Sequence, residues 1–351
     1  WVLLRDGQRI KSGTCPLPHI APGETGSVRI DGAEFTRDAH EYVLRISFRL
    51  LQDTDWAEAG HEVAWDQFVV HGGKQPKLPA EYPQYGALQV ERLRNEVVVK
   101  GDNFRLTFST VYGVIDSFIY NDVELIDQGP RLNFYRAPID NDKHYVADWQ
   151  KYGLHRLQHK ITGVEVSDPT DDGSVAITVK GWVAGAVYAS GFNCEYVYRI
   201  MPDGTVAIDV SGEPFGELGV IPRIGLSLVL PGTFERAAWY GLGPNETYPD
   251  SKQAGKIGIY KALVEDLYTP YVFPQENGNR ADTRWVSMNN IRGIGLMVTA
   301  PELFNFSAHH FSAHALAAAN HTNELVREDL TYLTLDHKVL GLGSASCGPR
   351  T

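Results

Sequence analysis

The densest run of side chains that could do chemistry is residues 136–142, Arg-Ala-Pro-Ile-Asp-Asn-Asp. Asp140 and Asp142 flank the amide of Asn141, so two carboxylates and an amide stand side by side. Oxygen atoms in this arrangement can bind a cation, position a sugar hydroxyl, or hold a turn through their own backbone. The run lacks the glycine and the distal glutamate of an EF-hand loop, so it does not predict calcium. A binding loop and a self-bonded turn both remain open.

Two further clusters combine aromatic rings with amide, carboxylate and guanidinium groups. They cover residues 241–250, Gly-Leu-Gly-Pro-Asn-Glu-Thr-Tyr-Pro-Asp, and residues 268–285. Rings stack on the apolar faces of sugars while amides and charges bond the hydroxyls, so this pattern is typical of carbohydrate recognition. The alternative is that the rings belong to the core and that Glu276 pairs with Arg280 or Arg284.

Three histidines raise the question of zinc. His310 and His314 are four residues apart, but the zinc-protease helix needs a glutamate directly after its first histidine, and Phe-Ser-Ala stands here instead. With His309 they are therefore not predicted to bind a metal.

The GxSxG, Walker and dinucleotide glycine motifs are also missing from the sequence. A glycosidase carboxylate pair is defined by a separation of about 5 to 9.5 Å in space, not by sequence spacing. Its candidates here are Asp140, Asp142, Glu246 and Glu276.

The elements that must position these clusters are strands, because apolar residues recur at every second position along most of the chain. In residues 44–50, Leu, Ile, Phe and Leu alternate with Arg and Ser, which is typical of a strand with one buried face. Pro-Asp-Gly at 202–204 separates two such runs and predicts a hairpin. The predicted strands include residues 44–50, 104–108, 175–179, 196–200 and 206–210. With 34 Gly and 19 Pro between such runs, the predicted fold class is all-β, a sandwich or barrel.

Helical signals are sparse. Ser312 is expected to cap a short helix over residues 313–319, because its hydroxyl can accept from a free N–H and the following alanines lose no side-chain entropy. A second short helix is expected around Trp149. Neither is long enough to organise a helical domain.

Composition narrows the class of protein. The 351 residues are 43% hydrophobic and carry 32 Lys and Arg against 43 Asp and Glu, a formal net charge of −11. The apolar content argues against disorder, and the acidic balance argues against an electrostatic nucleic-acid binder. No apolar run reaches the roughly 18 residues of a membrane helix, and the first residues do not form a signal peptide. A soluble globular chain is predicted.

Cys15, Cys194 and Cys347 are interpreted as free thiols, with a Cys194–Cys347 disulfide as the alternative.

A domain boundary is expected at residues 72–79, Gly-Gly-Lys-Gln-Pro-Lys-Leu-Pro, because two glycines and two prolines cannot sustain a strand ladder. The predicted domains are residues 1–74 and 80–351. Trp1 stands within an apolar run without an initiator methionine, which suggests a piece of a longer protein. A cytoplasmic location is expected only from the lack of disulfide signals.

The three polar clusters, in this order and spacing, resemble the C-terminal region of the large bacterial β-galactosidases of glycoside hydrolase family 2. The resemblance covers essentially the whole chain, and its specificity comes from the combination of motifs. It rests on residues 136–142, 222–225, 241–250 and 268–280, and on Ala-Trp-Asp-Gln-Phe at 64–68.

The resemblance implies an immunoglobulin-like β-sandwich for residues 1–74 and a large supersandwich, similar to the aldose 1-epimerases, for residues 80–351. It implies a parent enzyme that hydrolyses terminal non-reducing β-D-galactosides such as lactose with retention. The two catalytic glutamates of that family belong to a (β/α)₈ barrel, and this chain has no alternating βα pattern. No residue here is therefore predicted to be catalytic, and the chain alone is predicted to be inactive.

The resemblance also implies one wall of a sugar pocket. In this family an aromatic residue near the C-terminus stacks on galactose, and the matching position is Tyr332, where the best-known members have tryptophan. Asp140, Asn141, Asp142 and His144 match a loop adjacent to the same pocket.

The implied partners are the rest of the parent chain, a galactoside and further copies in a homo-oligomer, with no nucleic acid and no membrane. No cofactor or metal is predicted in this chain, and divalent and monovalent cations are expected elsewhere in the parent. Two other functions stay open. A free-standing carbohydrate-binding module would use the rings of Tyr271, Phe273 and Trp285. A mutarotase would need an acid and a base from Glu276 and the three histidines at 309, 310 and 314.

Overall fold

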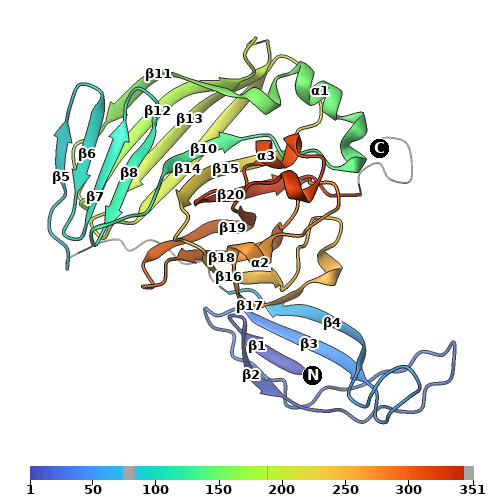
Figure 1. The fold of residues 1–351 in the computed structure, drawn as a ribbon. Helices are drawn as coiled ribbons and strands as arrows, with labels where there is room; N and C mark the ends of the chain where they lie inside the picture. The colour runs from blue at the N-terminus through green and yellow to red at the C-terminus, as the bar shows by residue number, and fades with distance from the viewer. Residues whose placement is uncertain (74–81, 83, 188, 344–351) are drawn as a thin grey trace.

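The computed structural model describes residues 1–73, 82, 84–187 and 189–343. Strands dominate these residues, and the helices are short (Figure 1). The predicted all-β fold class is confirmed. Most of the expected linker, both predicted domain bounds and Cys347 lie outside the described residues. Within the described part, no helix combines the length and the apolar run that a bilayer span requires.

Residues 1–71 contribute one antiparallel sheet, which we call the N-terminal sheet, with the strand order β2-β1-β3-β4. Its strands are β1 Val2–Arg5, β2 Gln8–Ser12, β3 Tyr42–Arg49 and β4 Glu62–His71. Strand β3 confirms the run predicted at 44–50, but its buried face carries Val43, whereas Phe48 is 45% exposed. The buried side differs from the prediction because β3 turns Val43 and Arg45 toward the larger part of the chain.

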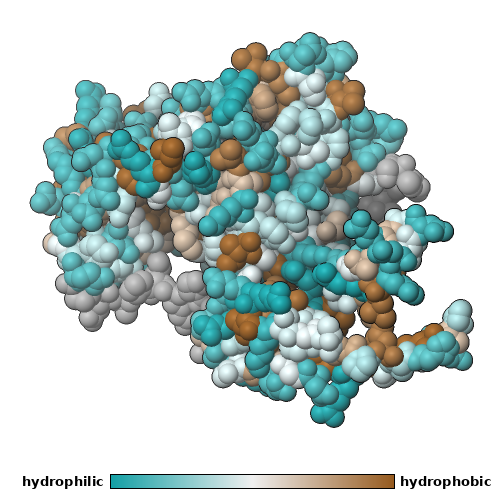
Figure 2. Space-filling view, turned by 60° about the horizontal axis from the view of Figure 1, so that its bottom comes forward, coloured by the Kyte–Doolittle hydropathy of each residue, from teal (hydrophilic) through white to brown (hydrophobic). Residues whose placement is uncertain are grey.

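The opposite face of the N-terminal sheet is apolar and only partly covered. Leu44 and Phe68 are cross-strand partners on this face, and Phe68 is exposed. Figure 2, in which this end of the molecule comes forward, shows hydrophobic residues among hydrophilic ones on its surface. Residues 1–73 form no second sheet over this face, so this part of the chain presents a single layer.

Two further sheets pack face to face in the larger part of the chain (Figure 1). One has the order β5-β6-β7-β8-β9 and the other β11-β12-β13-β14. Their strands are β5 Gln89–Arg92, β6 Glu96–Lys100, β7 Phe104–Ser109, β8 Val114–Tyr120 and β9 Val123–Glu124, then β11 Gln158–Val166, β12 Val175–Ala184, β13 Gly191–Ile200 and β14 Val206–Phe215. The buried rings of Phe108 and Tyr198 lie 5.0 Å apart between the two sheets. The predicted hairpin is confirmed as β13 and β14, with Ile200 paired to Val206.

The largest sheet has seven strands in the order β10-β15-β20-β19-β18-β16-β17. They are β10 Gln128–Asn133, β15 Arg223–Pro231, β16 Arg236–Gly243, β17 Lys256–Leu263, β18 Arg280–Asn289, β19 Gly295–His309 and β20 Leu330–Val339. Strand β20 pairs with β15 on one side and with β19 on the other, so it lies inside the sheet. Buried rings such as Trp239 and Phe306, 5.8 Å apart, belong to its core.

The helices of the described part are short. They are α1 Val146–Lys151, α2 Val264–Leu267 and α3 Ala313–Ala318, with 3-10 turns η1 Asp140–His144, η2 Leu154–Arg156, η3 Lys252–Ala254 and η4 Thr322–Glu324. Helix α3 begins where predicted, and Ser312 Oγ accepts from the Ala315 N–H at 3.1 Å. Helix α1 contains the buried Trp149, whose Nε1 donates to Val220 O at 2.8 Å. Both predicted helices are confirmed.

The N-terminal sheet is joined to the seven-stranded sheet by a mostly buried ion pair. Both carboxylate oxygens of Glu41 accept from Arg284, at 2.7 and 3.0 Å, and one also accepts from the Tyr240 hydroxyl. Beside this pair, a small apolar core brings Leu4 and Val43 of the N-terminal sheet against Tyr240. The two parts of the chain therefore pack as one body.

Candidate functional site

The structure brings the three polar clusters of the sequence together. Glu276 N donates to Ala137 O at 3.3 Å, which joins the third cluster to the first. Thr247 N donates to Asn279 O at 2.7 Å, and Asn279 Nδ2 donates to Thr247 O at 2.7 Å, which joins the third to the second. Segments up to 139 residues apart in the sequence thus form one polar site, which we call the polar cluster.

The first segment of the polar cluster is a turn closed by its own ion pair. Arg136 and Asp142 are both fully buried, with Nε to Oδ2 at 3.1 Å and Nη2 to Oδ1 at 2.8 Å. Asp142 Oδ2 also accepts from Ile139 N at 3.1 Å, and Arg136 donates to the carbonyls of Leu340 and Gly341 just after β20. Both oxygens of Asp142 therefore already accept hydrogen bonds from within the protein. For this carboxylate the structure supports the self-bonded turn, and not the binding loop.

The centre of the polar cluster is a guanidinium shared by two carboxylates. Arg223 Nη2 lies 3.0 Å from Glu276 Oε1 and 3.2 Å from Asp336 Oδ2, and all three side chains are almost completely buried. Tyr248 donates its hydroxyl to the same Glu276 oxygen at 3.3 Å. One positive charge thus faces two carboxyl groups away from water.

The pairing of Glu276 with Arg280 or Arg284, which the alternative interpretation required, is not formed. Arg280 donates to the carbonyl oxygens of Leu267 and Gly278, at 3.0 and 2.6 Å. Arg284 points to the N-terminal sheet, where it binds Glu41. The two nearer arginines are drawn away by backbone carbonyls and by the domain junction, so Glu276 meets an arginine from β15 instead.

Burial sets the protonation of the polar cluster. It raises the pKa of Asp336 to about 7, against the attraction of Arg223 and with a smaller contribution from the Glu276 charge. For Arg223, burial acts to lower the pKa, but Asp336 and Glu276 outweigh it and hold the pKa above its ordinary value, so the guanidinium stays charged. Burial lowers the pKa of His309, which favours a neutral ring. Neither oxygen of Asp336 accepts a well-formed hydrogen bond from the residues that the structure describes.

Glu246, another carboxylate of the polar cluster, orders an exposed loop. Glu246 accepts from the Tyr271 hydroxyl and, at 2.6 Å, from Gly278 N. Beyond Tyr271, Val272 is 86% exposed and Phe273 is exposed as well. Of the four carboxylates named as glycosidase candidates, only Asp140 is exposed.

The predicted site residues fall into two groups. Tyr332 is half-buried on β20, paired with Val229 and His309, and donates its hydroxyl to Glu328 at 2.6 Å. At the other end of β20 lies the η1 turn, where Asn141 Nδ2 donates to Leu342 O at 2.7 Å.

The other members of the η1 turn are placed as follows: Asp140 and His144 are exposed, and Asp142 is buried. Leu340 O accepts a hydrogen bond from Arg136, which in turn binds Asp142 of this turn. Leu340 lies eight residues beyond Tyr332 along β20 and its continuation, a distance of about 26 Å at the usual rise of a strand. A single sugar ring cannot contact both groups.

The three histidines do not converge. His309 Nε2 lies 2.9 Å from Asn277 O, His310 Nδ1 lies 2.8 Å from Leu330 O, and His314 Nε2 lies 2.8 Å from His155 O. Across residues 1–73, 84–187 and 189–343, no three His, Cys, Asp or Glu side chains are placed to hold a metal.

The arrangements needed for the two other functions are not formed as expected. For a mutarotase, Glu276 and His309 both lie buried inside the polar cluster, out of reach of a sugar. For a binding module, Trp285 packs at the junction with the N-terminal sheet while Tyr271 is held by Glu246, so their rings form no common platform.

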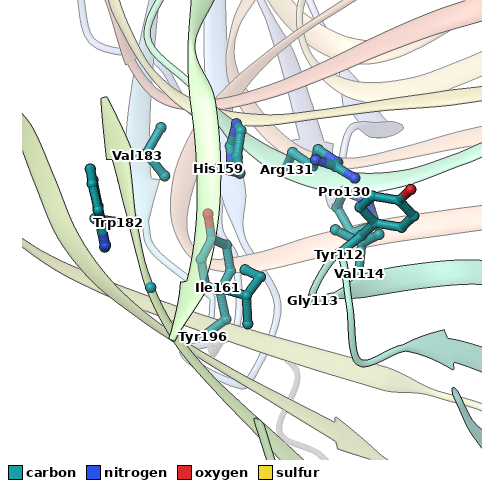
Figure 3. Close-up of a pocket in the computed structure, with 11 residues that line it drawn as sticks. Tyr112, Gly113, Val114, Pro130, Arg131, His159, Ile161, Trp182, Val183 and Tyr196 are labelled. Atoms are coloured by element: carbon teal, nitrogen blue, oxygen red, sulfur yellow. The ribbon is translucent and has the colours of Figure 1, made fainter. Parts of the chain in front are cut away.

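Sequence reasoning missed one cavity and two central residues. The cavity is lined by Tyr112, Arg131, His159 and Tyr196 among others, and Figure 3 shows these side chains around it. Its volume of about 10 Å³ has room for about one water molecule. Burial, with a smaller contribution from Arg131, lowers the pKa of His159 to about 4, so its ring is neutral at pH 7.

The two residues that sequence reasoning missed are Arg223 and Asp336. Arg223 lies in residues 222–225, one of the runs that carry the family resemblance. The residues next to it in sequence do not indicate that it pairs with buried carboxyl groups. Asp336 interrupts an apolar alternation in residues 333–340, and a carboxylate at a strand position is the signal that could have found it.

Two family models match this chain. The model described as β-galactosidase small chain matches residues 100–351, and that described as β-galactosidase, domain 4, matches residues 1–71. The chain belongs to the β-galactosidase small-chain family. The resemblance stated from its motifs is thereby confirmed, and the polar cluster is a feature of its small-chain region.

Curated relatives of this small-chain region are named β-galactosidase. The protein of Priestia megaterium is 30% identical over 98% of this chain and 33% of its own length. That of Vibrio cholerae is 32% identical over 97% and 33%, and that of Pseudoalteromonas haloplanktis is 29% identical over 98% and 33%. The chain thus spans about a third of the length of the curated relatives it matches.

Proposed function

We propose that this chain is the C-terminal part of a β-galactosidase whose complete form hydrolyses terminal non-reducing β-D-galactosides, lactose among them, with retention. The family match and the one-third span of the relatives support this role. The catalytic glutamates belong to a barrel in the rest of the parent, which is also the principal partner of this chain.

The structural observation that carries the proposal is the engagement of the carboxylates. Asp142 is held by Arg136, Glu276 by Arg223, and Glu246 by Tyr271 and Gly278 N. A glycosidase needs two carboxyl groups that face the same sugar, one as acid and one as nucleophile or base. These three groups instead stabilise the fold, which suits a supporting domain.

The chain alone should not hydrolyse o-nitrophenyl β-D-galactoside. The reason is that its buried carboxylates are already occupied and cannot reach a glycosidic bond. The measurement is release of o-nitrophenol by the purified 351-residue chain, with Asp140→Asn and Glu276→Gln run beside it. Hydrolysis that either substitution removes would show that the chain carries its own active site and would refute the supporting role.

We propose further that Tyr332 supplies one aromatic wall of the galactose pocket in the complete enzyme. Its ring is half-exposed and its hydroxyl is fixed by Glu328, so the ring is held in one orientation. In the full-length protein, Tyr332→Ala should raise KM for lactose about tenfold, because ring stacking contributes about 1–1.5 kcal/mol. Tyr112→Ala, at an exposed position between β7 and β8, serves as the control. If His144→Ala raises KM and Tyr332→Ala does not, the wall belongs to the η1 turn.

A further inference from the structure

An open groove lies on the β11–β14 sheet, away from the polar cluster. Its volume is about 650 Å³, within the range of about 300–1,000 Å³ that is typical of ligand sites. The lining comes from all four strands and includes Thr162 of β11, Lys180 and Trp182 of β12, Asn193 and Glu195 of β13, and Ser211 and Glu213 of β14. None of these residues belongs to the polar cluster.

Strand register places these side chains in two rows on one face of the sheet. Trp182 is paired with Asn193, and Asn193 with Glu213. In the second row, Lys180 is paired with Glu195, and Glu195 with Ser211. Three neighbouring strands span about 10 Å, and the rows are about 7 Å apart, which leaves room for two sugar rings side by side along a row.

The floor between the rows is backbone. Gly181, Cys194 and Gly212 stand between the two rows in register, and the Cys194 side chain points into the core. At the edge, a β-bulge between Ile161 and Gly163 adds Thr162 to the lining, and bulges commonly re-aim a side chain toward a site. A groove with a flat floor and polar walls results.

Trp182 provides an aromatic platform at one end of the groove. Its side chain is half-buried, and the Lys160 ammonium lies 5.0 Å from the ring centroid. A cation–π contact of this kind contributes about 0.5–1 kcal/mol at exposed sites, so stacking of a ligand ring can compete with Lys160 at small cost. Figure 3 shows Trp182 among the residues that line the closed cavity, together with His159, Arg131 and Tyr112.

The charges of the groove balance. Lys160 and Lys180 oppose Glu195 and Glu213, and the Lys180–Glu195 pair is loose at 3.7 Å with side chains 57% and 44% exposed. Such an exposed pair is worth about 0–1 kcal/mol and can exchange its partner for ligand hydroxyls. A balanced field favours neither a polyanion nor a polycation. A ring platform beside carboxylates, an amide and hydroxyls fits a neutral polyhydroxylated ligand.

We propose that this groove binds a neutral oligosaccharide of at least two rings, with one ring stacked on Trp182 and hydroxyls bonded by Asn193, Glu195 and Glu213. This proposal does not depend on the role proposed for Tyr332. It would hold a longer glycan or a neighbouring sugar chain against the surface of the protein.

Calorimetric titration of the 351-residue chain with galactotriose tests the proposal. Saturable millimolar binding is expected, with Kd raised at least tenfold by Trp182→Ala and about threefold or more by Glu213→Gln. Trp56→Ala removes an exposed tryptophan far from the groove and should leave Kd unchanged. Glu213 is exposed, so its substitution tests the site even if Trp182→Ala does not fold.

Three results would overturn the proposal. They are the lack of saturable galactotriose binding by the wild-type chain, equal Kd values for wild type, Trp182→Ala and Glu213→Gln, and tighter binding of the anionic trigalacturonate than of galactotriose. Because none of these measurements involves hydrolysis, their failure is distinguishable from failure of the proposed β-galactosidase role.

Discussion

Arg223→Met should lower the free energy of unfolding of this chain by about 3–5 kcal/mol. The side chain of methionine replaces most of the volume, but Glu276 and Asp336 lose the guanidinium that pairs with both of them. Removing one partner of a buried ion pair leaves an uncompensated charge in the interior, which is strongly destabilising. The measurement is urea denaturation followed by circular dichroism, with the wild type at the same pH.

The control for this substitution is Arg105→Met on β7, an exposed arginine that should change stability by less than about 0.5 kcal/mol. The loss at Arg223 should also be larger at pH 8 than at pH 5, because the pKa of Asp336 is about 7 and its carboxyl group is protonated, and so uncharged, at pH 5. A loss of less than about 1 kcal/mol at pH 8 would mean that the cluster does not depend on its shared guanidinium.

The second large effect is a dependence of stability on pH that a single carboxyl group produces. The pKa of Asp336 is raised from 3.8 to about 7 by burial. A carboxyl group with a higher pKa in the folded state stabilises the fold fully below the unfolded pKa, and this stabilisation is lost as pH rises through the folded pKa. At about 1.4 kcal/mol per pH unit, the total is on the order of 4 kcal/mol between about pH 4 and pH 7.

Asp336→Asn should remove this dependence, because an amide of the same shape does not ionise and Arg223 keeps Glu276 as its counter-charge. We expect the variant to be more stable than the wild type at pH 8 and similar to it at pH 5. Denaturation midpoints at both pH values provide the measurement. Asp116→Asn, at an exposed position of β8, should follow the wild type. If Asp336→Asn also follows the wild type, the ionisation of Asp336 does not govern stability.

The local sequence pattern predicts the strands and helices, but it does not predict which side chains contact one another across the fold. The alternation in residues 196–210 and the Pro-Asp-Gly turn predict the β13–β14 hairpin, and Ser312 predicts the start of α3. Both depend on neighbours within a few residues. The buried side of β3 was predicted wrongly because it depends on what packs against the strand, and alternation alone marks both faces equally.

The polar cluster shows where sequence reasoning stops. Glu276 has two arginines within eight residues, yet its partner is Arg223, 53 residues away. The choice follows from the order of strands in the sheet, which places β15 beside β20 and turns Arg284 toward Glu41. The clusters were identified from their residue types, but their role in holding the fold became visible only through these long-range contacts.

The order of strands in the largest sheet also bears on how the protein is made. Strand β20 comes last in sequence among the described strands, yet it separates β10 and β15 from the other four strands of its sheet. During synthesis, β15 and β19 emerge from the ribosome before β20. They cannot be linked into one sheet until residues 330–339 have emerged and paired with both of them. A chain stalled before residue 330 would expose the edges of β15 and β19 and would lack the Asp336 partner of Arg223. Nascent chains of this protein should therefore be prone to aggregation until residues 330–339 have emerged.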